Sequence, residues 1–146
     1  MTWGNPPKFV PTNKPVVSKV IQPEDIAGKS EGSQQKALMV WAALNTNNYP
    51  QLRYIFHVPN GGTRNVREAV ELKAQGVKAG VPDLFLPAPI GLFAGAFIEM
   101  KVKPNLPTPE QTIWVGELRR LGYYVKVCYS WQEARDVLIN YLEGKL

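Results

Sequence analysis

Apolar residues recur along this chain with the spacings that distinguish helices from strands, and turns rich in glycine, proline or asparagine separate the segments. Leu38, Trp41 and Ala42 lie at helical spacing. They predict a helix that begins at Ser30 or Ser33 and ends in the asparagine-rich segment near residue 45.

Three further helices are predicted over residues 65–76, 108–121 and 130–144, because each begins with a capping residue followed three positions later by Glu or Gln. Strands are predicted over residues 52–58, 81–86, 96–102 and 123–129, which are rich in aromatic, β-branched and other apolar residues. The order is helix, strand, helix, strand, strand, helix, strand, helix. This order predicts an α/β sandwich with a mixed central sheet.

Residues 1–29 contain five prolines and four lysines and show no sustained periodicity. We therefore predict an extended arm over residues 1–29 and one folded domain over residues 30–146. The arm is either a loose tail or a basic strap over a polyanion or a partner subunit.

Composition excludes some classes of site. The single cysteine, Cys128, and the single histidine, His57, supply too few soft ligands for a structural zinc site, so any catalytic metal must be held mainly by oxygen. No apolar stretch approaches the roughly 18 residues that span a bilayer, and the N-terminus lacks a signal peptide. We expect a cytoplasmic protein with no membrane partner and no nucleotide cofactor. The net charge of +5 permits binding to phosphates without requiring it.

The segment AFIEMKV, residues 96–102, carries the candidate chemistry. A strand's period of two places Phe97, Glu99 and Lys101 on one face, where burying two charges would be costly without a purpose. Asp83 lies 16 positions earlier, on the predicted neighbouring strand. A second carboxylate can therefore approach Glu99.

Two carboxylates close together repel each other in a low dielectric and are stabilised by a divalent cation, for which Mg²⁺ or Mn²⁺ is the natural choice. Lys101 would position a water molecule or balance the charge of the transition state. The alternative is a structural cluster of ion pairs with no catalytic role.

The strings GVKAGVPDLFLP, FIEMKVK and PTPEQTIWVGELRRLGYYVKVCYSWQEA, in this order, resemble the VRR-NUC nuclease domain, a branch of the PD-(D/E)XK phosphodiesterase superfamily. The resemblance runs from Ser30 to Tyr141 and includes HVPNGG. It implies a restriction-endonuclease-like sandwich whose helices flank a central mixed β-sheet. The chain is similar to the compact stand-alone form of phages and bacteria, which implies a homodimer that acts on branched or structured DNA in a bacterial or phage-infected cell.

The same resemblance implies roles for individual residues. Asp83 and Glu99 would bind the metal together with the Met100 carbonyl, and Lys101 takes the place of the catalytic lysine. Glu31 matches the acid of the family's N-terminal helix and would complete the metal shell. Glu31 alternatively only stabilises the positive end of its helix.

Gln35 and Gln111 match glutamines that line the family's site. Gln111 has an equally good local explanation, because Thr108 and Gln111 have the spacing of a capping box. His57 is either a hydrogen-bonded strand residue or a residue that faces the substrate, as the family's similar HVPNG stretch suggests.

Glycine and basic residues near the second predicted helix form a candidate DNA-contacting rim. The backbone of a glycine-rich turn can receive a phosphate, and basic side chains around it can hold a duplex across the site. The alternatives are a plain turn and scattered solvated charges. The rim residues are Asn60, Gly61, Arg64, Arg67 and Lys78.

Together these features predict a Mg²⁺- or Mn²⁺-dependent endonuclease that hydrolyses DNA phosphodiester bonds with water as the nucleophile. Two alternatives stay open. One is a DNA-binding module with little activity unless a partner protein is present, which the set of Asp83, Glu99 and Lys101 disfavours. The other is an RNA-processing nuclease.

Overall fold

A four-stranded mixed sheet forms the centre of the structure, a computed structural model that describes residues 19–59 and 65–146. The strand order is β1-β2-β3-β4. The first two pairs are antiparallel, whereas β3 and β4 are parallel. The mixed sheet expected from the sequence is confirmed. Its strands are β1 (Phe56–His57), β2 (Leu84–Leu86), β3 (Ala96–Met100) and β4 (Tyr124–Cys128).

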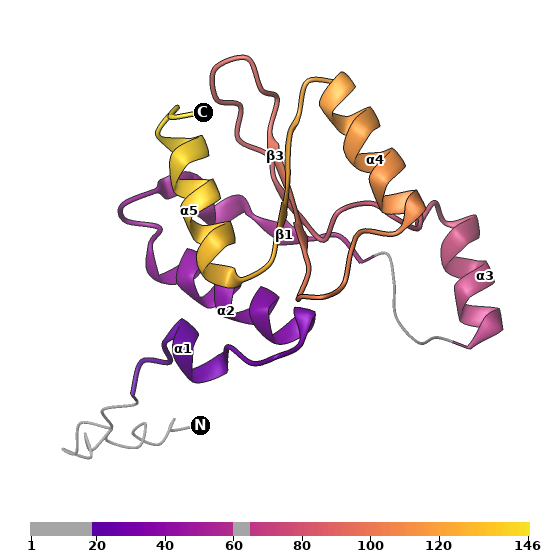
Figure 1. The fold of residues 1–146 in the computed structure, drawn as a ribbon, viewed down its shortest axis with the longest axis horizontal. Coiled ribbons are helices and arrows are strands. Elements are labelled where there is room, and N and C mark those ends of the chain that lie inside the picture. The colour runs from indigo at the N-terminus through magenta and orange to yellow at the C-terminus, as the bar shows by residue number, and fades with distance from the viewer. Residues whose placement is uncertain (1–18, 60–64) are drawn as a thin grey trace, which may run out of the picture.

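Helices cover both faces of the sheet (Figure 1), with α2 (Glu31–Leu44) and α5 (Trp131–Leu142) on one face and α4 (Pro109–Arg120) on the other. Alternate residues of β3 serve the two faces, as its sequence period predicts. Ile98 and Met100 join the larger apolar core under α2 and α5, and Phe97 joins a smaller core under α4. The α/β sandwich is confirmed.

Side-chain caps set the starts of the long helices. Ser30, Thr108 and Ser130 each accept a hydrogen bond from the backbone amide three residues later, which satisfies an otherwise unpaired donor. Asn65 caps α3 (Val66–Ala74) in the same way. None of the residues of α3 is buried, and the helix stands apart from the sheet in Figure 1.

Two segments differ from expectation. Residues 52–58 were expected to form one strand, but a 3-10 helix, η1 (Pro50–Tyr54), precedes the two-residue β1. Pro50 fixes a helical φ at the first position, and burial of Leu52 and Ile55 explains the apolar pattern. A short helix, α1 (Pro23–Ile26), also interrupts the segment expected to be extended, and it packs against α2.

No helix in the described part of the chain is long and apolar enough to cross a membrane.

Candidate active site

The end of β2 brings two carboxylates together. Leu84 pairs with Ile98 in the antiparallel register, so Asp83 lies opposite Glu99 one step beyond the strand. The Asp83 carboxylate accepts a hydrogen bond from the Met100 backbone amide, with 2.8 Å between Oδ2 and N. The aspartate side chain thus extends the pairing of β3 where β2 has ended. This is the convergence that the sequence predicts.

Glu99 is the most deeply buried acid of the site, with 1% of its surface exposed. Its Oε1 accepts hydrogen bonds from the Lys101 ammonium, at 2.9 Å, and from the Gln111 amide. Its Oε2 is also buried but has no hydrogen-bond partner among the described residues. Burial and the nearby Asp83 charge raise the pKa of Glu99 to about 7. One oxygen is therefore held by donors and the other is left for a ligand.

Burial also raises the pKa of Asp83, against the opposing effects of the Met100 amide and the Lys101 charge. Both acids of the pair thus resist ionisation. A cation placed between them would remove the cause of that resistance, because it favours the charged form of each carboxylate.

Lys101 is the positive charge that the site already contains. Only 6% of its surface is exposed, and its ammonium lies 2.9 Å from Glu99 Oε1 and 3.8 Å from Glu31 Oε2. Burial lowers its pKa, but the hydrogen bond to Glu99 and the charges of the three acids outweigh this effect and raise the pKa overall. The ammonium therefore stays protonated near neutral pH and acts as a donor and a positive charge.

Gln111 fulfils both of the roles that the sequence left open. Its Oε1 accepts a hydrogen bond from the Thr108 backbone amide at 2.8 Å, which completes the capping box of α4. Its Nε2 donates to Glu99 Oε1. Since an amide has a separate acceptor and donor end, the cap fixes the side chain that orients Glu99.

Gly80 places the segment before Asp83 against the start of α4. Its φ is +87°, in the left-handed region, and a Cβ atom here would lie 2.8 Å from the Glu110 backbone carbonyl carbon. Only glycine permits this approach without displacing backbone. The chain leading to Asp83 and the helix turn carrying Gln111 are therefore in direct contact.

Glu31, in the first turn of α2, reaches the same site from the other side of the sheet's end. Its Oε1 accepts a hydrogen bond from the Asn105 side chain at 3.1 Å, and its Oε2 faces Lys101. Asn105 was not predicted as a site residue. Its only sequence signal is a place in the proline-rich turn between β3 and α4, and its contact partner lies 74 positions away.

Comparison with known proteins identifies the family of this arrangement. The VRR-NUC domain family model matches residues 22–132. The chain belongs to the VRR-NUC domain family. Among solved structures, one described as a VRR_NUC domain protein is similar with a TM-score of 0.68 and 29% sequence identity, over 80% of this chain and 90% of its own. No curated protein matches the chain at a significant level.

Membership of the VRR-NUC family implies a nuclease-type function. The resemblance stated from the sequence is thereby confirmed. The family match begins at residue 22, before the domain boundary predicted at residue 30, and that boundary stays a prediction.

The side chains of this VRR-NUC domain fit a hard divalent cation. Asp83 and Glu99 supply carboxylate oxygens, the donor type that Mg²⁺ and Mn²⁺ prefer, and the buried, unpartnered Glu99 Oε2 is suited to face a cation. Over residues 19–59 and 65–146, no three His, Cys, Asp or Glu side chains already form a metal-binding group. The Glu31 carboxylate contacts Asn105 through Oε1 and Lys101 through Oε2.

Two of the predicted DNA-contacting residues, His57 and Gln35, lie on elements next to the acids. His57 is exposed on β1, and its Nδ1 lies 2.8 Å from the Asp83 carbonyl oxygen. Because a carbonyl only accepts, Nδ1 carries the hydrogen and Nε2 is free to contact a ligand. Gln35 is half-buried one turn beyond Glu31 on α2.

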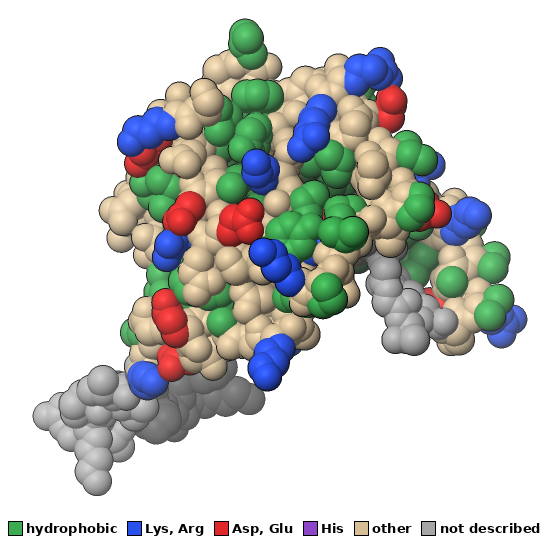
Figure 2. Space-filling model, in the orientation of Figure 1, with side chains coloured by type: hydrophobic (Ala, Val, Ile, Leu, Met, Phe, Trp, Pro, Cys, Tyr) green, Lys and Arg blue, Asp and Glu red, His purple; other side chains and the backbone are tan. Residues whose placement is uncertain are grey.

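The two remaining rim residues within the described ranges, Arg67 and Lys78, form no hydrogen bond or ion pair with Glu31, Asp83 or Glu99. Arg67 is exposed on α3, the helix that stands apart, and Lys78 lines a shallow cavity beside Pro59. Asn60, Gly61 and Arg64 lie outside the described residues. On the face shown in Figure 2, basic side chains are interspersed with acidic and apolar ones. Charge on this face therefore does not mark a DNA path.

Proposed function

We propose that this VRR-NUC domain is a Mg²⁺- or Mn²⁺-dependent endonuclease that hydrolyses phosphodiester bonds in DNA. The observation that carries the proposal is the Glu99 carboxylate, opposite Asp83, with one oxygen held by two donors and the other buried without a partner. A binding module or a structural ion-pair cluster has no need for that unpartnered oxygen, because leaving it buried costs free energy.

In this proposal, Asp83 and Glu99 Oε2 would hold the cation, together with the Met100 carbonyl and Glu31. The chemistry that a bound cation would supply is polarisation of the phosphate and a lowered pKa of a water molecule. The Lys101 ammonium donates a hydrogen bond to the attacking water or to a phosphate oxygen that gains negative charge in the transition state. The hydrogen bond from Gln111 to Glu99 Oε1 would keep Oε2 available for the cation.

In this proposal water is the nucleophile and no covalent enzyme intermediate forms, and by resemblance the products carry a 5′-phosphate and a 3′-hydroxyl. The resemblance also supports a homodimer that acts on branched DNA. His57 Nε2, Gln35 and the basic rim would contact the DNA backbone, which positions a duplex without reading its sequence.

A cleavage panel tests the activity. Linear, flapped and four-way DNA and matched RNA are incubated with Mg²⁺, Mn²⁺ or EDTA and with the wild type, Asp83→Ala or Lys101→Ala. Exposed residues provide matched controls, Asp136→Ala and Lys145→Ala. Both site variants are expected to fold and to bind DNA but to lose cutting, whereas the controls cut normally.

Equal cutting by the wild type and both site variants would show a contaminating nuclease and would remove the enzymatic claim. Cutting of RNA alone would reassign the substrate. Light scattering of the purified protein tests the homodimer, which predicts twice the mass of the chain.

A further inference from the structure

Asn105 connects the chain that follows β3 to the first turn of α2. Its side-chain Nδ2 donates to Glu31 Oε1 at 3.1 Å. The other oxygen of that carboxylate, Oε2, faces the Lys101 ammonium at 3.8 Å. Glu31 is thus held at both oxygens, and both contacts come from the same continuous stretch of chain, residues 101–105.

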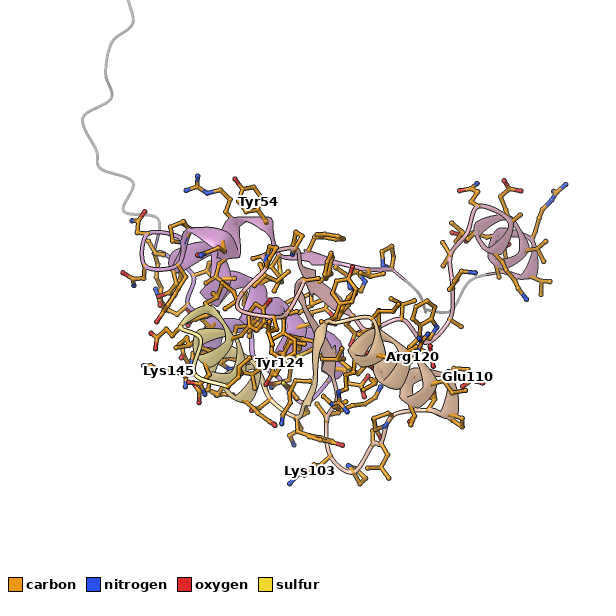
Figure 3. All side chains as sticks on the ribbon, turned by 90° about the horizontal axis from the view of Figure 1, so that it is seen from above. Tyr54, Lys103, Glu110, Arg120, Tyr124 and Lys145 are labelled. Carbon is orange, nitrogen blue, oxygen red and sulfur yellow. The ribbon has the colours of Figure 1, made fainter. Side chains whose placement is uncertain are left out.

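The position of the Asn105 donor is fixed by its own backbone. The Asn105 amide donates to the Val102 carbonyl at 2.9 Å, which closes a turn, and the amide of Lys101 donates to the Cys128 carbonyl at 2.9 Å, which ties the start of the turn to β4. Prolines at positions 104 and 107 restrict the backbone on either side. Figure 3 shows Lys103 of this turn pointing outward, away from the sheet.

Glu31 needs such support more than the other acids do. Its side chain is 37% exposed, whereas that of Glu99 is 1% exposed. An exposed glutamate samples several rotamers, and all but one of them are lost when the carboxylate binds a cation. A hydrogen bond that already selects one direction reduces this loss, as partners of metal ligands do generally.

We propose that Asn105 is a positioning residue that holds the Glu31 carboxylate toward the cation site and so raises the affinity for a divalent cation. This inference rests on the proposed function, in which Glu31 completes the shell around the cation. Asn105 acts through Glu31 and touches neither the cation nor the DNA.

The test measures Mn²⁺ binding to the full chain without DNA, by electron paramagnetic resonance of the free ion. Asn105→Ala removes the donor and is expected to weaken Mn²⁺ binding by about tenfold. Asn48→Ala is the matched control, because Asn48 is exposed and, among the described residues, its side-chain amide hydrogen-bonds only to Asn45.

A double-mutant cycle separates positioning from a general effect on the fold. In a Glu31→Ala background, Asn105→Ala should weaken Mn²⁺ binding no further, because its only route of action is gone. Unchanged binding by Asn105→Ala, or an equal loss in both backgrounds, would overturn the proposal. A loss of thermal stability without a loss of affinity would do the same.

Asp83→Asn, titrated in parallel, distinguishes a failure of the Asn105 role from a failure of the cation site. If Asp83→Asn abolishes Mn²⁺ binding while Asn105→Ala has no effect, only the role of Asn105 fails. If Asp83→Asn binds Mn²⁺ like the wild type, the proposed cation site fails and the role of Asn105 fails with it.

Discussion

Replacing Glu99 by glutamine is expected to stabilise the metal-free protein at pH 8, although Glu99 is a candidate metal ligand. The pKa of Glu99 is raised from 4.5 to about 7 in the folded protein, first by burial and then by the Asp83 charge. The folded state therefore binds the proton more tightly than the unfolded state. Stability is greatest below the unfolded pKa and is lost as the pH rises through 7.

The size of the effect follows from the shift. A shift from 4.5 to about 7, at about 1.4 kcal/mol per pKa unit, costs about 3 kcal/mol in full, and most of this cost appears between pH 5 and pH 8. Glutamine resembles the protonated acid and carries no charge at either pH. Any change in packing is the same at both pH values, so it cancels when the two are compared.

Urea unfolding in EDTA at pH 5 and pH 8 measures this difference. The free energy of unfolding of Glu99→Gln, relative to the wild type, should rise by about 2 to 3 kcal/mol from pH 5 to pH 8. The control variant Glu117→Gln replaces an exposed glutamate on α4 and should show no such rise. A rise that is absent or reversed for Glu99→Gln would refute the claim that burial and Asp83 destabilise the ionised form.

Other substitutions test the surroundings of the acids. Thr108→Ala should lower the free energy of unfolding by about 1 kcal/mol, because the helix cap is lost, and should leave DNA cleavage intact. Gln111→Leu should lower both the free energy of unfolding and the rate of cleavage. Equal cleavage by the two variants would limit the role of Gln111 to capping. Gly80→Ala should lower the free energy of unfolding in urea by about 1–3 kcal/mol, because the alanine must adopt a left-handed φ and its Cβ would clash with Glu110. An unchanged urea midpoint would contradict the close approach of Gly80 to Glu110. Burial raises the pKa of the Cys128 thiol to about 12, so a disulfide reagent at pH 8 should modify it only in concentrated urea. Rapid labelling of the native protein would contradict the burial of Cys128 on β4.

The sequence predicted the centre of the site because short-range rules govern it. A strand's period of two put Glu99 and Lys101 side by side, and the antiparallel turn between β2 and β3 brought Asp83 opposite Glu99. The helix starts were equally predictable, since caps such as Ser30 and Thr108 act within three residues.

Features that depend on tertiary contacts were predicted wrongly or not predicted. The aromatic and β-branched residues of 52–58 predicted a strand. A 3-10 helix buries Leu52 and Ile55 instead, and the same spacing of apolar residues is compatible with either structure. Asn105 has a partner 74 positions away, and no periodicity records such a pair. The division of the chain at residue 30, the homodimer and the contacts of the DNA rim stay predictions.

Anomalous diffraction from crystals soaked in MnCl₂ would locate the cation that Asp83 and Glu99 are proposed to bind. We expect a manganese peak within about 2 Å of an Asp83 carboxylate oxygen and of Glu99 Oε2, and its loss in Asp83→Asn. A wild-type crystal with no peak between these two acids, or with manganese bound only elsewhere, would contradict the proposed cation site.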